Sequence, residues 1–146
     1  MKEKYDITLV FIVPKGHEGV FGNDVKYVSF IGDLKFSSWL HNKSIDLLHL
    51  PHQYCRFKHF PNVRKTLMTI HDINFMYEKQ GKKLEKYKKK FSKKLRLSDY
   101  ISYISQFTKQ DTESNFTVDC ETRIIYNGVT KVPADTIEVS EEFKKT

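Results

Sequence analysis

The stretch KTLMTIHDI, residues 65–73, decides how this chain is expected to fold. Its first part, residues 65–70, is rich in β-branched and apolar side chains and predicts a strand. His71 and Asp72 follow at the end of that strand. In an open parallel sheet, ligands bind beyond the carboxyl ends of the strands. This pair is therefore the first place where chemistry is expected.

Segments of related pattern lie on both sides of this stretch. Further strands are expected at residues 5–14, 26–31, 44–50, 100–104 and 122–126. Helical patterns occupy residues 34–42 and 83–98, and Ser105 can cap a third helix that runs to about residue 115. This alternation predicts an α/β fold: a Rossmann-like, mostly parallel sheet with right-handed crossovers and helices on both faces.

The composition indicates one domain with a buried core. The chain has 146 residues, of which 39% are hydrophobic and 29% are charged. The longest nearly apolar run, residues 7–13, is far shorter than the roughly 18 residues that span a bilayer. Cys55 and Cys120 form no CxxC motif and no disulfide framework, which favours a reducing compartment. A cytoplasmic location is therefore expected.

The net charge of +7 favours a negatively charged partner, such as nucleic acid, an anionic membrane face or a phosphorylated substrate. Much of this charge lies in one helix, where nine basic residues, the first Lys82 and the last Arg96, accompany a single acid, Glu85. Most such helix faces are simply solvated. A basic face can also rest on anionic lipid headgroups, which would place the protein peripherally on the inner membrane face.

Two other function classes share this fold. A basic nucleic-acid-binding domain would use the lysine-rich helix together with Tyr87 and Phe91. Both rings fall on the apolar stripe of that helix, so they are expected to be buried rather than stacked on bases. A flavodoxin-like or other doubly wound regulatory domain would have the sheet without the chemistry.

Three segments, taken in order, resemble the N-terminal halves of family 4 glycosyltransferases of the GT-B type. They are KTLMTIHDI (65–73), ISYISQFTKQD (101–111) and TRIIYNGV (122–129). They are similar to the family's strand ending in His-Asp, its strand followed by a serine-capped helix, and its strand ending in Asn-Gly. The resemblance covers residues 44–130 and is far more specific as an ordered set than any one segment.

The resemblance implies the acceptor side of an enzyme that moves a sugar from a nucleotide-activated donor to a glycan or lipid-linked acceptor. It implies retention without a metal, and no cofactor besides the donor nucleotide sugar. Residues 5–13 look like the family's second strand, so the opening strand, glycine-rich loop and helix are expected to be missing. Dimerisation through the sheet edge left exposed is a further expectation.

The domain boundaries follow from the same comparison. Residues 1–130 are expected to form a partial acceptor-side domain, and residues 131–146 a linker toward a missing donor-binding domain. In the family, the donor-binding half begins shortly after a segment similar to EEFKKT, residues 141–146. The chain alone is therefore expected to be catalytically incomplete.

The resemblance also assigns two candidate catalytic residues. His71 would hydrogen-bond an acceptor hydroxyl or the transferred sugar, whereas without the resemblance the favoured interpretation is a histidine that closes its strand by bonding to backbone. Asp72 could orient His71 or cap the turn that follows.

Four further residues are candidate substrate contacts. They are His52, Ser105, Asn127 and Gly128. Ser105 is first of all an N-cap, and the helix end behind it could also contact a phosphate or sugar. Asn127 and Gly128 form a common turn pair. In the resembling family the same pair lies close to the donor phosphates.

Two other patterns carry no functional prediction. His49, His52, Cys55 and His59 have spacings that zinc could use, but they match no closed structural motif, so no metal site is expected. The glycines of the 15–24 loop fail the dinucleotide fingerprint, because a loop and a strand follow them instead of a helix.

Overall fold

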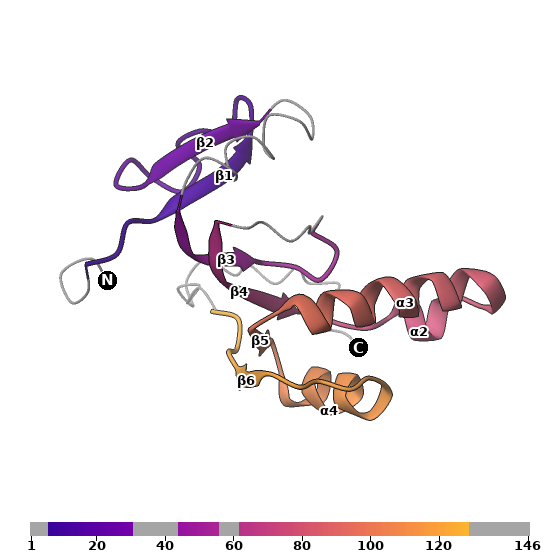
Figure 1. Cartoon of the computed structure of the whole chain (residues 1–146). Coiled ribbons are helices and arrows are strands. Elements are labelled where there is room, and N and C mark those ends of the chain that lie inside the picture. Colours follow the sequence, from indigo (N-terminus) through magenta and orange to yellow (C-terminus); the bar gives the residue numbers. More distant parts are fainter. Residues whose placement is uncertain (1–5, 31–43, 56–61, 129–146) are drawn as a thin grey trace, which may run out of the picture.

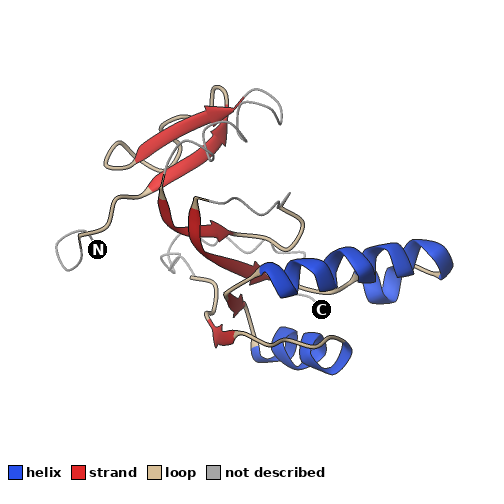
Figure 2. Cartoon of the chain, viewed as in Figure 1, coloured by secondary structure: helices blue, strands red, loops and turns tan. Residues whose placement is uncertain are grey.

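The computed structural model describes residues 6–30, 44–55 and 62–128, and the structural statements below concern these residues. Figure 1 shows their elements, and Figure 2 separates strands from helices by colour. In chain order they are β1 (Val10–Pro14), β2 (Lys26–Phe30), β3 (Ile45–Leu50), β4 (Val63–Ile70), α2 (Phe75–Glu78), α3 (Gly81–Leu97), β5 (Tyr100–Tyr103), α4 (Gln106–Asn115) and β6 (Glu121–Ile124). The predicted α/β fold is confirmed.

All strand pairs in the described part of the chain are parallel, and they form two sheets. The larger sheet has the order β3-β4-β5-β6, and β1 pairs with β2 in a smaller one. The smaller sheet has its own cluster of aromatic contacts: the ring of Phe11 stacks on Phe21 with centroids 4.5 Å apart. The Tyr27 hydroxyl donates to the carbonyl of Gly22 at 2.7 Å. The glycine-rich segment between these strands is a loop, as the sequence predicts.

The element boundaries differ from the predicted ones by a few residues. The predicted strand at 65–70 begins earlier, at Val63, and the predicted helix at 83–98 begins at Gly81. The first predicted strand, 5–14, shortens to β1. The short helix α2 was not predicted, because its few residues are too short a window for a helical period. The predicted helix at 34–42 and the predicted linker at 131–146 lie outside the described residues.

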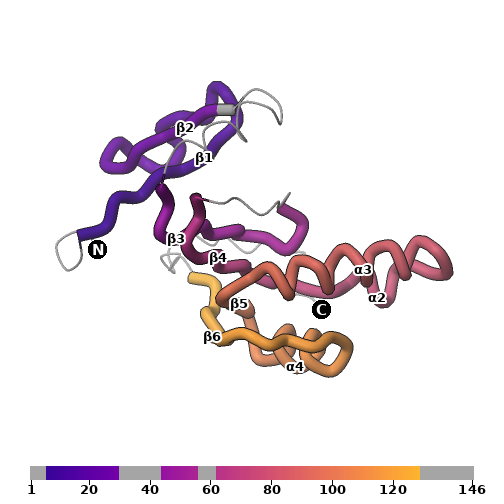
Figure 3. The backbone as a smooth tube through the Cα atoms, viewed as in Figure 1, coloured from indigo at the N-terminus to yellow at the C-terminus, as the bar shows by residue number. Residues whose placement is uncertain are grey.

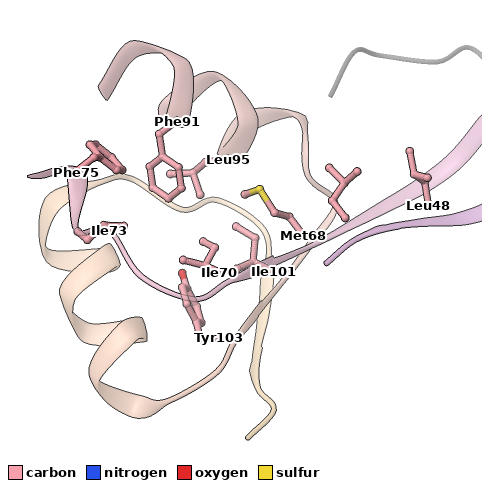
Figure 4. Packing of buried hydrophobic residues seen from close by; sticks show 10 residues of the cluster. Leu48, Met68, Ile70, Ile73, Phe75, Phe91, Leu95, Ile101 and Tyr103 are labelled. Carbon is pink, nitrogen blue, oxygen red and sulfur yellow. The ribbon is translucent and has the colours of Figure 1, made fainter. Parts of the chain in front are cut away.

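The core lies between the larger sheet and its helices. Met68 and Ile70 of β4 are 0% exposed and share one face of the strand, because strand side chains alternate. They meet Ile101 and Tyr103 of β5 and Phe91 and Leu95 of α3, as Figure 4 shows. Phe116, directly after α4, contacts the ring of Phe91 with centroids 4.9 Å apart. The described helices therefore share one core with the sheet.

The chain path explains why these helices lie together. From β4 through α3 to β5, and through α4 to β6, the strand order advances in a single direction (Figure 3). Right-handed crossovers that advance in one direction place their helices on the same face of a sheet. The opposite face carries a polar chain in which Thr69 Oγ1 lies 2.8 Å from His49 Nε2 and 2.7 Å from Ser102 Oγ.

Candidate functional site

The candidate site lies at the carboxyl edge of the larger sheet. Because β4, β5 and β6 are parallel neighbours, their carboxyl ends meet at this edge. His71 follows β4, Ser105 comes shortly after β5, and Asn127 follows β6. Adjacent strands are about 4.8 Å apart, so the ends of β4 and β6 are separated by about 10 Å. The topology thus collects at one edge residues that are distant in sequence.

The ring of His71 is held in one tautomer by the backbone. Its Nε2 lies 2.9 Å from the carbonyl oxygen of Pro51. Because a carbonyl can only accept, Nε2 carries the proton, and Nδ1 of the neutral ring is left with a lone pair. The backbone bond expected of a strand-closing histidine is therefore present, and it leaves the other ring nitrogen able to accept a hydrogen bond.

His52 stacks on His71 and has the complementary tautomer. The two ring centroids are 4.7 Å apart, with 27° between the ring planes. The backbone N–H of Tyr54 donates to Nδ1 of His52 at 3.1 Å, so the proton of the neutral ring is on Nε2. The imidazole pair, His52 and His71, thus offers one acceptor nitrogen and one donor nitrogen.

The environment of His52 favours its neutral form. Burial lowers the pKa of His52, and the neighbouring His71 and Lys94 lower it further, against the opposing effect of Asp72. Removal of the ring from water disfavours its charged form and is the main cause of the shift, and a positive charge on the stacked His71 ring adds to it. The neutral form of His52, with its proton on Nε2, is therefore favoured.

Gln53 joins the loop after β3 to the end of β4. Its side chain is 1% exposed. Its Oε1 accepts from the backbone N–H of His71 at 3.1 Å, and its Nε2 donates to the carbonyl of Asp72 at 2.9 Å. Sequence reasoning missed this residue, because a single glutamine inside a polar loop gives no local signal.

Lys94 of α3 holds the same loop from the other side. Its Nζ donates to the backbone carbonyls of Gln53 at 2.5 Å and Cys55 at 2.8 Å. Burial lowers the pKa of Lys94. From the sequence, Lys94 was expected to be one of the basic residues on the exposed face of the lysine-rich helix. In the structure it contacts the loop instead, so the basic face has one charge fewer than expected.

Asp72 caps the turn that leads into α2. Its Oδ1 accepts from the backbone N–H of Asn74 at 3.0 Å. Of the two alternatives that the sequence left open, orienting the His71 ring or capping the turn, this contact matches the cap. The carboxylate still lies directly beside His71 in the chain, at the same edge of the sheet.

Ser105 is the predicted N-cap of α4. Its Oγ accepts from the backbone N–H of Thr108 at 3.1 Å. Thr108 also reaches the candidate site, since its Oγ1 donates to the carbonyl of His71 at 3.1 Å. The start of α4, with its partial positive charge, is thereby fixed next to the end of β4.

The remaining candidates are less closely connected. Asn127 and Gly128 are exposed beyond β6, and within the described residues no hydrogen bond joins them to His71 or Ser105. Among the histidines and the cysteine considered for zinc, His49 bonds to Thr69. His59 lies outside the described residues. The part of the chain that the structure describes contains no group of three or more potential metal ligands.

No helix within the described ranges has both the length and the apolar character needed to cross a membrane. Comparison with curated proteins and with solved structures gives no match. The model of glycosyltransferase family 4, however, matches residues 4–131. This match includes all the candidate site residues and the larger sheet that positions them. The chain therefore belongs to glycosyltransferase family 4.

Proposed function

We propose that this chain forms the acceptor side of an enzyme that transfers a sugar from a nucleotide-sugar donor to a glycan or lipid-linked acceptor. Membership of family 4 supports a glycosyltransferase role in general. The observation that carries the finer proposal is the fixed tautomer of His71 at the carboxyl end of β4. This arrangement presents a hydrogen-bond acceptor where open α/β sheets bind their ligands.

Sugar hydroxyls suit the imidazole pair, because a hydroxyl both donates and accepts hydrogen bonds. In the proposed enzyme, Nδ1 of His71 accepts from a hydroxyl of the acceptor or of the transferred sugar. Nε2 of His52 donates to an oxygen of the same substrate. Both roles require neutral rings, and the lowered pKa of His52 supports this for His52.

Phosphate contacts are assigned to the other two strand ends. Ser105 is placed at the start of α4, where helix N–H groups favour anions. Asn127 and Gly128 follow β6 at the same edge and are proposed to approach the donor phosphates. The transfer is proposed to retain the sugar configuration without a metal, with the nucleotide sugar as the donor and no further cofactor. Resemblance to the family supports these assignments.

The nucleotide is proposed to be held mainly by a separate donor-binding half. The test compares the purified chain with an enzyme that carries this chain joined to such a half, using a panel of nucleotide sugars. Transfer and donor hydrolysis are expected only for the joined enzyme. Measurable turnover of any nucleotide sugar by the chain alone would overturn the division between the two halves.

A membrane surface is the proposed second partner. The exposed basic residues of α3 are Lys82, Lys83, Lys86, Lys89, Lys90, Lys93 and Arg96. Glu85 is the one acid of this helix, and its Oε1 lies 3.5 Å from Nζ of Lys88. Each cation near an anionic bilayer contributes about 1 kcal/mol, so this face suits a cytoplasmic, lipid-facing enzyme. The nucleic-acid alternative is weaker, because Phe91 is 4% exposed and is not available for base stacking.

Vesicle sedimentation tests the membrane proposal. At low salt the chain is expected to bind phosphatidylglycerol vesicles and not phosphatidylcholine vesicles. Replacement of Lys86, Lys89 and Lys93 by Glu is expected to abolish this binding. Replacement of Lys15, Lys26 and Lys109, which lie outside α3, is the matched control. Equal binding by the two triple variants would overturn the assignment to α3, and stronger binding to duplex DNA than to the anionic vesicles would favour the nucleic-acid alternative.

A further inference from the structure

We propose that Gln53 is a positioning residue that fixes the tautomer and the orientation of His71. Its part in sugar transfer rests on the proposed function, whereas its effect on the ring can be measured without any substrate. Gln53 and Lys94 are together called the Gln53–Lys94 clamp. It lies outside the residues that sequence reasoning assigned to the site.

The side-chain amide of Gln53 pairs with two successive peptide groups at the end of β4. It accepts from the N–H of His71 and donates to the carbonyl of Asp72, at 3.1 Å and 2.9 Å. A carboxamide has an acceptor and a donor side by side in one plane. Glutamate lacks the donor in its ionised form, and methionine of similar length lacks both groups. The pattern of bonds therefore requires an amide at this position.

Burial makes these two bonds consequential. Gln53 is 1% exposed, so water does not replace a bond that is lost. A buried backbone group that loses its hydrogen-bond partner is left with an uncompensated desolvation cost. The peptide groups beside His71 are thus strongly held in one orientation while the amide is present.

The same loop sets the tautomer of His71. The carbonyl oxygen of Pro51, close to Gln53 in the chain, accepts a hydrogen bond from Nε2 of His71 at 2.9 Å. Lys94 fixes the loop to α3 through the carbonyls of Gln53 and Cys55. Loss of the clamp would let the Pro51 carbonyl move away from Nε2. The His71 ring would then be free to exchange tautomers, and Nδ1 would lose its fixed role as the acceptor.

The test is the tautomer of His71, read from the ¹⁵N shifts of its two ring nitrogens by NMR at a pH where the ring is neutral. In the wild-type chain the Nε2–H form is expected. In Gln53→Met a mixture of both tautomers is expected, with the remaining backbone amide spectrum retained. Thr112→Val is the matched control, because Thr112 is wholly buried and its hydroxyl has no partner in the described residues. This control is expected to leave His71 unchanged.

Lys94→Met provides a second, independent variant that removes the clamp without altering the Gln53 side chain. It is expected to produce the same mixture of tautomers. An unchanged Nε2–H form in either folded variant would overturn the proposal. Failure of both variants to fold would also overturn it, because the clamp would then be a structural element of the core.

The joined enzyme gives a readout that a purely structural role would not change. Gln53→Met is expected to lower kcat by about 10- to 100-fold, the scale expected when a reacting group is misplaced, with little change in the KM for the donor. Thr112→Val is expected to keep the wild-type kcat. The two proposals can fail separately. If Gln53→Met shows mixed tautomers of His71, but a variant without the His71 ring still transfers sugar at the wild-type rate, the positioning proposal stands and the proposed function fails.

Discussion

At the scale of single residues, the site shows which interactions a sequence can and cannot reveal. The cap formed by Ser105 was predictable, because a serine directly before a helix is a local signal. Gln53 and Lys94 were not predictable, since they act on partners 18 and 41 positions away in the chain. The sequence predicted that His71 and Asp72 follow a strand, and they do follow β4, but the tautomer of His71 depends on the Pro51 carbonyl, which only the fold supplies.

A pH dependence of stability follows from His52. Its pKa is lowered from the ordinary value of 6.5, mainly by burial. A group with a depressed folded-state pKa contributes stability that is complete above its unfolded value and is lost as the pH falls toward the folded value. The free energy of unfolding is therefore expected to fall as the pH decreases below about 6.5.

Urea unfolding at a series of pH values measures this effect. His52→Gln is expected to flatten the dependence below pH 6.5, since the titrating ring is removed. His17→Gln is the control, because His17 is exposed in the loop between β1 and β2. An identical pH dependence for wild type and His52→Gln would contradict the assignment of the effect to His52.

At the scale of elements, periodicity predicted the strands and the long helices. Short elements and the pairing of strands were not predictable in this way. The apolar stripe in the sequence of α3 predicted both the helix and its buried face, which includes Phe91 and Leu95. The division of the strands into two sheets was not predictable, because pairing depends on contacts such as Phe11 with Phe21 that no period reveals. The short helix α2 depends on the turn that Asp72 caps.

The docking of α3 is expected to depend most on Phe91. Its ring contacts Phe75 and Phe116, with centroids 5.4 Å and 4.9 Å away. Phe91→Ala is expected to lower the free energy of unfolding by about 3–5 kcal/mol through lost burial and a residual cavity. Lys90→Ala, at an exposed neighbouring position, is expected to change it by no more than about 0.5 kcal/mol. Similar values for the two variants in denaturant unfolding would contradict the packing of this core.

At the scale of the whole molecule, family membership and the fold support each other. The family match at residues 4–131 contains the parallel sheet whose carboxyl edge carries the candidate residues. The donor, the acceptor and the division of work between two halves depend on surfaces and partners that a single sequence pattern does not encode. The identity of the family, in contrast, was predictable from the ordered set of three motifs.

Association of two copies through a sheet edge is also a prediction at this scale. Within the described residues, β3 and β6 each pair with a single neighbour in the larger sheet. An unpaired strand edge can pair with another chain. Light scattering coupled to size-exclusion chromatography is expected to show a dimer at micromolar concentration, and a monomer across that range would contradict the prediction.

The most direct test of the central claim is the transfer rate of the joined enzyme with and without the imidazole of His71. His71→Gln is expected to lower kcat by at least about 100-fold, because glutamine has no ring with an acceptor Nδ1 fixed by a hydrogen bond from Nε2 to the Pro51 carbonyl. His17→Gln, which changes an exposed histidine, is expected to keep the wild-type rate. Equal rates for His71→Gln and wild type would contradict the claim that this edge of the sheet takes part in sugar transfer.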